Sequence, residues 1–184
     1  MEALIVRRRA HLLASLATLG LAWLALLPWL GAAQADDTLE YKIKAAYLYK
    51  FAPFVAWPDK VFASPDSPIN VCVSGANPFG AALDRIAAGQ RVGGRPVQVK
   101  HVASVAPDSL CQIVFLGGSA EQSPAQGAAA LRGQPVLTVT DGAGGIIGFV
   151  LVDNRVRFSI DKAAADESHL AISSKLLSLA VEAH

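Results

Sequence analysis

The chain has 184 residues, 53% of them hydrophobic, and its 16 basic and 15 acidic side chains leave a formal net charge of +1. This length supports one domain with a sizeable core. The near-neutral charge lacks the basic excess that nucleic-acid binding requires, so we exclude nucleic acid as a partner.

The first 35 residues have the pattern of a secretory signal peptide. Arg7–Arg9 precede an uncharged apolar run from Leu12 to Leu27, and the small residues Ala33-Gln34-Ala35 follow. A basic start, an apolar middle and an Ala-x-Ala site predict cleavage between Ala35 and Asp36. We therefore expect one soluble domain, residues 36–184, that works outside the cytoplasm.

The alternative is that this segment is retained as a membrane anchor. Counted from Ala10 to Leu30, the apolar run is about long enough to cross a bilayer. Pro28 interrupts a helix near the end of that run, and together with the Ala-x-Ala site it favours cleavage.

Apolar periodicity predicts the elements of the mature chain. A helix is expected over residues 38–52, and Pro53 should bend or end it. Short apolar or alternating runs predict strands, and capping and turn residues predict the helices between them. The strands are expected at residues 69–75, 96–102, 112–116, 136–140, 146–152 and 156–160. Helices are expected at residues 78–89 and 123–131, with a single helical turn at 107–108.

A last helix is expected to close the chain, with one apolar stripe and a charged segment before it. The stripe consists of Ile172, Leu176, Leu179 and Ala180. The charged residues are Asp161, Lys162, Asp166 and Glu167. We interpret these carboxylates as helix-start residues that match the helix dipole, and the alternative is the charged rim of a recognition surface.

Strands that alternate with helices predict an α/β domain. We expect a single domain with a mixed, mostly parallel sheet flanked by helices, followed by a C-terminal antiparallel strand pair and the final helix. The two cysteines, Cys72 and Cys111, are expected to form a disulfide in an oxidising compartment, and two buried free thiols are the alternative. A bond between them would bring the first and third strands together, which fits the spatial order 2-1-3 of flavodoxin-like sheets.

The sequence contains no clear catalytic or metal-binding pattern. His101 and His169 lie outside any Ser, Cys or metal constellation and are interpreted as surface histidines. Residues Gly75–Gly80 follow a strand as a phosphate loop does, but lack the Lys-Ser/Thr of that motif. The loop Asp141–Gly145 precedes a strand pattern, so we interpret it as a hairpin turn. We therefore expect no enzymatic activity, no metal and no cofactor.

Several segments, in their order and spacing, resemble the YfiR family. The resemblance covers essentially the whole of the mature chain. The segments that carry it are Ala46–Phe51 with Val55–Pro58, Val71–Gly75 with Pro78-Phe79, Cys111–Phe115, Val136–Asp141, Arg155–Asp161 and Ile172–Leu177.

The resemblance implies a periplasmic, non-enzymatic repressor in Gram-negative bacteria. Such a protein binds the periplasmic sensor region of a membrane diguanylate cyclase (YfiN-like) and lowers cyclic di-GMP signalling, which controls biofilm formation and motility. An outer-membrane lipoprotein (YfiB-like) is a second implied partner, and an open sheet edge permits a homodimer. A second disulfide known in the family has no counterpart in the segment Gly145–Val152, which contains no cysteine.

We expect the partner to contact Phe149 from the late hairpin and Ile172 and Leu176 from the last helix, with Glu167 at the rim. Binding would then act by differential affinity for one state of the sensor. The alternative for these apolar side chains, above all Ile172 and Leu176, is that they are core.

The alternative function is a small-ligand-binding module, with Tyr47, Arg157 and His169 around a pocket. His169 is of special interest because Ser168-His169 stands where the family usually has a small residue and Gly before Leu170. That departure leaves the local helix geometry open.

Overall fold

The computed structural model describes residues 31–182 of the chain. The chain divides into a first unit that ends at Thr38 and a second that begins at Leu39. Residues 1–30 of the predicted leader lie outside the described residues, and the predicted cut after Ala35 falls within helix α2 (Gly31–Lys50). The fold described below is that of the second unit.

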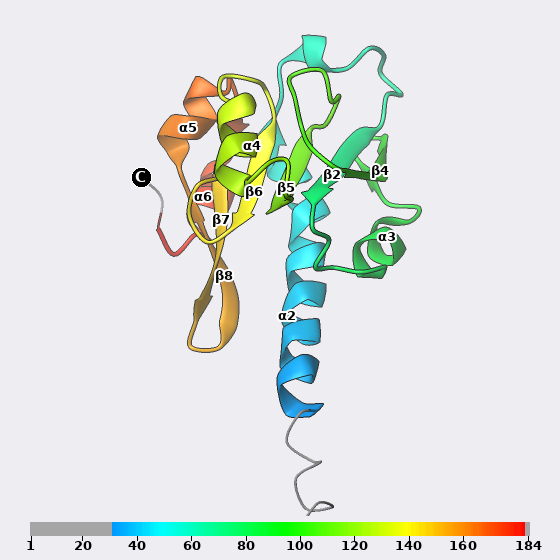
Figure 1. The fold of residues 1–184 in the computed structure, drawn as a ribbon. Helices are drawn as coiled ribbons and strands as arrows, with labels where there is room; N and C mark the ends of the chain where they lie inside the picture. Colours follow the sequence, from blue (N-terminus) through cyan, green and yellow to red (C-terminus); the bar gives the residue numbers. More distant parts are fainter. Residues whose placement is uncertain (1–30, 183–184) are drawn as a thin grey trace, which may run out of the picture. The chain divides into compact units, whose positions relative to one another are not determined.

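The second unit is an α/β domain with a seven-stranded mixed sheet, as the sequence predicts (Figure 1). The sheet order is β3-β4-β2-β5-β6-β7-β8, and β1 and β9 form a separate two-stranded sheet. The strands are β1 (Val55–Ala56), β2 (Ile69–Gly75), β3 (Arg91–Val92), β4 (Arg95–Val102), β5 (Ile113–Gly118), β6 (Leu137–Asp141), β7 (Ile147–Val152), β8 (Arg155–Ile160) and β9 (Ala171–Ile172). Besides α2, the α-helices of the described residues are α3 (Ala82–Ala87), α4 (Pro124–Ala130), α5 (Lys162–Glu167) and α6 (Ser174–Leu177).

Strand pairing confirms the predicted 2-1-3 arrangement. β2 lies between β4 and β5 and pairs with both in parallel. β5, β6 and β7 continue the parallel part of the sheet, and β8 closes it antiparallel to β7. The two-residue turn between β7 and β8 is Asp153-Asn154, and both residues have positive φ, as the tight hairpin turns that match strand twist require. The short strand β3 at the other end was not expected.

The expected hairpin between β6 and β7 is wrong, because these two strands pair in parallel. Val139 lies beside Ile147, so the chain must return along β6 within the loop 142–146 before β7 begins. The side chains of Thr138 and Thr140 hold this loop: their hydroxyls accept hydrogen bonds from the N–H groups of Ile146 (3.0 Å) and Gly145 (3.1 Å). The loop therefore crosses β6 on the face that carries the two threonines.

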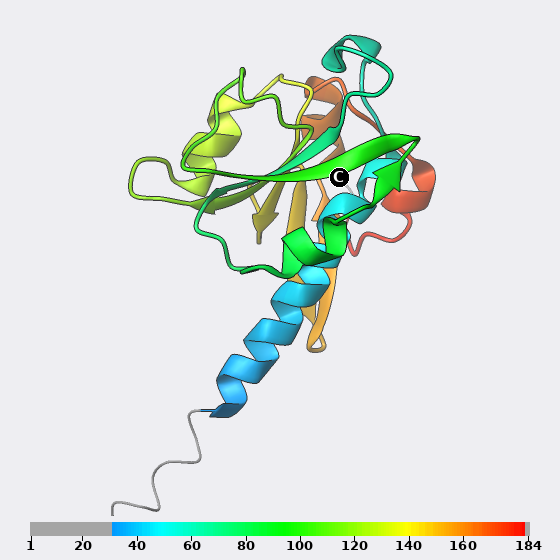
Figure 2. The ribbon, with the colours of Figure 1, turned by 90° about the vertical axis from the view of Figure 1, so that its right-hand side faces the viewer.

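Two hydrophobic clusters pack on opposite faces of the sheet, because alternate strand residues point to opposite sides. The larger cluster lies where the α2 segment, residues 39–51, meets the sheet through Leu48 and Phe51. The smaller one contains Cys72, Val114 and Leu131 and lies beside α4. Figure 2 shows α4, in yellow-green, and α6, in red, on opposite sides of the sheet.

Cys72 and Cys111 form the predicted disulfide, with their Cα atoms 6.0 Å apart. Cys72 lies in β2, and Cys111 lies just before β5, the strand beside it. Both cysteines are buried, at 0% and 4% exposure. The bond ties β2 to the segment that leads into β5.

The C-terminal region corrects the prediction of one closing helix. It contains α5, β9 and α6, and Ile172 lies in β9 opposite Val55 of β1. α5 ends because His169 takes a positive φ of 56°, while the N–H groups of His169 and Leu170 bond back to the carbonyls of Asp166 and Ala165. This pattern is a Schellman cap, in which a left-handed residue stops the helix.

The charged segment before Ile172 is itself helical. Asp161 caps α5 by accepting a hydrogen bond from the Ala164 N–H at 2.8 Å, which agrees with the helix-start interpretation. Asp166 and Glu167, in contrast, lie in the last turn of α5, where a carboxylate does not match the helix dipole.

Three further boundaries differ from the predictions. α2 ends at Lys50, and a 3-10 turn over Ala52–Phe54 contains Pro53. Helix α3 begins at Ala82 rather than at Pro78, because residues 78–81 form a turn. The predicted helical turn at residues 107–108 is a turn closed by the Ser109 N–H bonding to the Ala106 carbonyl.

Candidate functional site

A buried lysine network joins α2 to the carboxyl end of β6. Lys44 is only 3% exposed, and its Nζ contacts the carboxylates of Glu40 and Asp141. Tyr41 Oη donates a hydrogen bond to Asp141 Oδ2 at 2.9 Å. Lys44 Nζ also lies 4.8 Å from the ring centre of Tyr41 and 5.9 Å from that of Phe149. The network fixes the α2 segment beside β6 and β7.

The same contacts decide which protons the network holds. Burial alone would lower the pKa of Lys44, but the hydrogen bonds and charges of Asp141 and Glu40 outweigh burial and raise that pKa above its ordinary value. Burial, followed by the hydrogen bond and charge of Asp141, raises the pKa of Tyr41. Both groups stay protonated at neutral pH, so neither acts as a base or nucleophile, and the network is a structural anchor.

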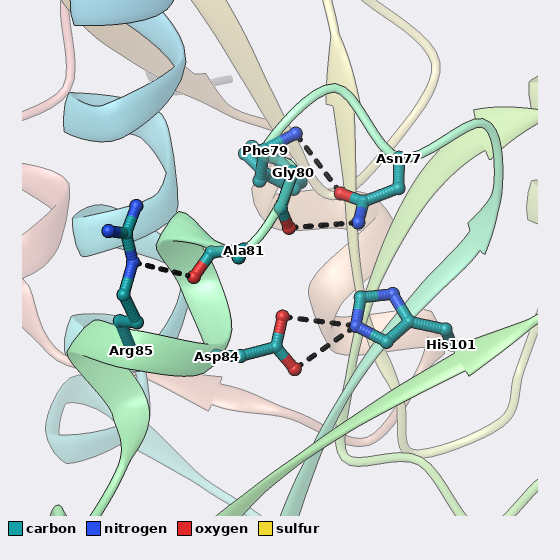
Figure 3. Close-up of polar contacts among 7 residues, drawn as sticks. All are labelled: Asn77, Phe79, Gly80, Ala81, Asp84, Arg85 and His101. Atoms are coloured by element: carbon teal, nitrogen blue, oxygen red, sulfur yellow. Dashed lines mark hydrogen bonds and ion pairs between the residues drawn. The ribbon is translucent and has the colours of Figure 1, made fainter.

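The loop after β2 uses its own polar side chain to shape itself (Figure 3). Asn77 Oδ1 accepts the Phe79 N–H and Asn77 Nδ2 donates to the Gly80 carbonyl, both at 3.0 Å. These bonds occupy both the oxygen and the nitrogen of the Asn77 amide. Helix α3 that follows has six residues, and the arrangement agrees with the interpretation of a tight turn rather than a phosphate loop.

His101 pairs with Asp84, a partner that the sequence did not reveal. His101 Nε2 lies 3.2 Å from both carboxylate oxygens of Asp84, which reaches across from α3 to β4 (Figure 3). The two side chains are 43% and 46% exposed. In the described residues no serine or cysteine side chain hydrogen-bonds to this pair, so it lacks the nucleophile of a catalytic triad. It acts as a surface link between α3 and β4.

The structure separates the four expected partner contacts into surface and core. Phe149 and Leu176 are 1% and 3% exposed, so their side chains belong to the core and do not face a partner. Phe149 packs against Tyr47 and Phe51 of the α2 segment, which covers it. Glu167 is exposed and Ile172 is half-buried, so these two remain on the surface.

The three expected pocket residues do not come together. Tyr47 packs against Phe158 on the inner face of β8, at 5.8 Å between ring centres. Arg157 is exposed and, because strand residues alternate, points to the face opposite Phe158. His169 is exposed at the end of α5. Of these three side chains, only His169 lines the groove described next.

His169 instead borders a different groove, of about 740 Å³, near the start of β5 and β6. Its ionisable lining residues are Lys60 and His169, and no Asp or Glu of the described residues lines it. Leu110, also in its wall, is 72% exposed and has a positive φ of 51°. Asn70 Nδ2 holds that backbone by donating to the Leu110 carbonyl at 2.7 Å. Sequence reasoning missed Leu110, since nothing in the pattern around it signals either the strain or the exposure.

Two further properties concern the described residues as a whole. Residues 31–182 hold no group of three His, Cys, Asp or Glu side chains placed to bind a metal ion. Within the same range, no helix combines the length and the hydropathy needed to cross a bilayer.

The comparisons with known proteins identify the family. Residues 41–181 match the model of the YfiR/HmsC-like family, a span that covers nearly all of the second unit. The comparison with curated proteins found no match. The matched region contains the disulfide, the sheet and the α2 anchor described above. The chain therefore belongs to the YfiR/HmsC-like family, and at the level of that family it is a periplasmic regulator of cyclic di-GMP signalling.

Proposed function

We propose that this protein is a negative regulator that binds the periplasmic sensor region of a membrane diguanylate cyclase and lowers cyclic di-GMP synthesis. The family match over residues 41–181 carries the proposal. In this proposal residues 1–35 are a cleaved signal peptide and the rest is the periplasmic domain. The Cys72–Cys111 disulfide supports an oxidising compartment.

The chemistry of the described side chains supports binding rather than bond making. The most buried cation, Lys44, is held protonated by two carboxylates, and the exposed Asp84–His101 pair has no nucleophile beside it. A regulator that makes no covalent bond acts by binding another protein through its exposed surface. The family match, to regulators that are not known enzymes, supports a non-enzymatic role in this proposal.

The exposed residues of the C-terminal region are the contact we propose. Glu167 and the half-buried Ile172 come from α5 and β9, and they keep their proposed roles. Leu179 and Val181, which are 56% and 45% exposed, add apolar area beyond α6. Exposed apolar side chains rimmed by charge are typical of protein-binding surfaces. Leu176, the buried residue of α6, supports this region from the core.

The mechanism is a shift of population in the cyclase. A domain that binds the inactive sensor state about tenfold more tightly than the active one shifts the equilibrium between them by about 1.4 kcal/mol. No covalent step is needed. An outer-membrane lipoprotein that competes for the same domain would relieve repression by lowering its free concentration.

The test is binding of the exported protein to the sensor domain of the nearest membrane diguanylate cyclase of the same organism, with cellular cyclic di-GMP as the second readout. Glu167→Lys should weaken binding at least tenfold, whereas Asp108→Lys, an exposed control with the same charge change, should alter it less than twofold. Failure of the wild type to bind any such sensor, with cyclic di-GMP unchanged on deletion, would rule out the proposal.

A second candidate function is binding of a small anionic ligand in the groove beside Leu110. The groove offers the Lys60 ammonium and the imidazole N–H of His169 as hydrogen-bond donors and no described carboxylate, which favours an anion with an apolar body. A thermal-shift series with aromatic carboxylates and nucleotides tests it. Stabilisation that disappears in Lys60→Ala supports ligand binding, and no shift at millimolar concentration excludes these classes.

A further inference from the structure

The β7–β8 hairpin extends beyond the rest of the sheet as a two-stranded ribbon (Figure 1). β7 pairs with β6 only through Ile147, Gly148 and Phe149. On the other side, β8 is bonded to the C-terminal segment only at Phe158 and Ile160. Residues 150–157 therefore have no third strand on either edge within the described chain.

The directions of the backbone N–H and carbonyl groups of β8 identify which of them have no strand to pair with. The Phe158 carbonyl accepts the Val181 N–H, and the Ile160 N–H donates to the Glu182 carbonyl, so these residues point their backbone groups away from β7. Every second residue of a strand points the same way, which places the N–H and carbonyl of Val156 on that outer edge. Val156 lies opposite Leu151 in the register, which is the non-hydrogen-bonded kind of pair.

The charges beside this open edge are of one sign. Arg155 and Arg157 flank Val156, both are exposed, and neither has an acidic partner within 4.0 Å among the described residues. They share one face of the ribbon, while Val156 and Leu151 share the other. Leu151 is 53% exposed, so the second face presents an apolar side chain to solvent.

These charges disfavour a second copy of the chain on this edge. Antiparallel pairing of two β8 edges about Val156 would place Arg155 of one copy directly opposite Arg157 of the other, which is repulsive. A register shifted toward the turn would bring Asp153 or Asn154 into the ladder, but both have positive φ and cannot continue a strand. A register shifted the other way would meet the C-terminal segment, whose Val181 N–H already bonds to the Phe158 carbonyl. The outer edge of β8 therefore disfavours pairing with the same edge of a second copy and favours a segment of opposite charge.

We propose that the outer edge of β8 at Arg155–Arg157 receives an extended acidic segment of the partner protein as an added strand. The segment has the pattern acidic–apolar–acidic: its carboxylates face the two arginines, and its central side chain lies beside Val156, on the face that Leu151 shares. The C-terminal segment already bonds to the same edge two residues further along, and it brings Glu182 there. This inference rests on the proposed function, because it names a contact of the same regulator with its partner.

Charge reversal tests the edge in the complete exported protein with the sensor domain as the probe. Arg155→Glu/Arg157→Glu should weaken binding at least tenfold, and most of that loss should vanish at high salt. Arg91→Glu/Arg132→Glu is the matched control, with two exposed arginines on β3 and after α4 and the same change of charge. It should change binding less than twofold. Reversing the acidic segment of the partner to lysine should restore binding to the β8 variant.

Hydrogen exchange gives a second readout that does not depend on a variant folding. The Val156 amide should exchange quickly in the free protein and at least tenfold more slowly in the complex. Wild-type binding that is equally strong in the β8 variant, or that leaves Val156 unprotected, overturns this inference while the proposed function stands. Absence of wild-type binding to the sensor overturns both.

Discussion

Lys44 Nζ lies 2.5 Å from Asp141 Oδ1, and this contact joins residues 97 positions apart in the chain. Lys44→Met removes the cation and leaves the carboxylates of Asp141 and Glu40 facing each other. We expect a loss of about 2 kcal/mol in the free energy of unfolding. Urea unfolding followed by circular dichroism measures it, and Lys42→Met, an exposed neighbour, should cost less than about 0.5 kcal/mol. Equal effects would show that the network contributes nothing.

The same network predicts an alkaline limit to stability. The pKa values of Lys44 and Tyr41 lie above the ordinary 10.5 and 10.0 in the folded protein. A raised pKa gives stabilisation that is complete below the unfolded value and is lost as the pH rises through the folded one. The urea midpoint should therefore not change on account of these two groups between pH 7 and 9, and it should fall above about pH 10, where Tyr41 of the unfolded chain begins to lose its proton. In Tyr41→Phe/Lys44→Met the alkaline fall should be smaller, and an unchanged fall would assign it to other groups.

Gly148 of β7 packs closely against Gly142 of the loop that precedes the strand. A Cβ there would lie 2.5 Å from the Gly142 carbonyl oxygen, a backbone atom that cannot swing away. Gly148→Ala should cost about 3 kcal/mol, because the loop or the strand must move. Gly133→Ala is the control: its φ is +69° but no atom lies within 4 Å, so only backbone strain of about 1 kcal/mol applies. Chemical denaturation of both variants compares them, and a smaller loss at Gly148 would contradict the crossing of the loop over β6.

His169 offers a stabilising substitution. Its φ of 56° at the end of α5 is a conformation that glycine adopts without steric cost. His169→Gly should raise the free energy of unfolding by roughly 0.5–1 kcal/mol, after the added flexibility of the unfolded chain is subtracted. His169→Ala separates the causes, since it removes the imidazole but keeps the strain and should give no gain. A gain in both variants would point to the imidazole rather than the backbone.

The sequence predicts the parts of this fold that depend on local pattern. Ile69–Gly75 forms the expected strand residue for residue, because a fully buried strand is a continuous apolar run between turn signals. Ser123 caps α4 through the expected Ser-Pro start. The order of the central strands followed from the two cysteines, which carry long-range information that few other residues do.

The errors arise where tertiary contacts choose between two local possibilities. Asp141–Gly145 suits a hairpin by composition, and only the hydroxyls of Thr138 and Thr140 show that the loop folds back over β6. The apolar stripe at the C-terminus suits one helix, but Ile172 pairs with Val55 as a strand residue and Ser173 caps a separate short helix after it. Phe149 was expected to contact a partner. The alternation of residues along β7 places Phe149 on an apolar face, but the sequence pattern does not reveal that Tyr47 and Phe51 cover that face.

The return of the chain along β6 also constrains the order of assembly. β7 and β8 are joined by two residues and can pair with each other on their own. β7 can pair with β6 only after the intervening loop has adopted its conformation. The last two strands should therefore join as a preformed pair, late in folding. Until then the free edge of β6 is open to unwanted association, and a newly made chain is most vulnerable at that stage.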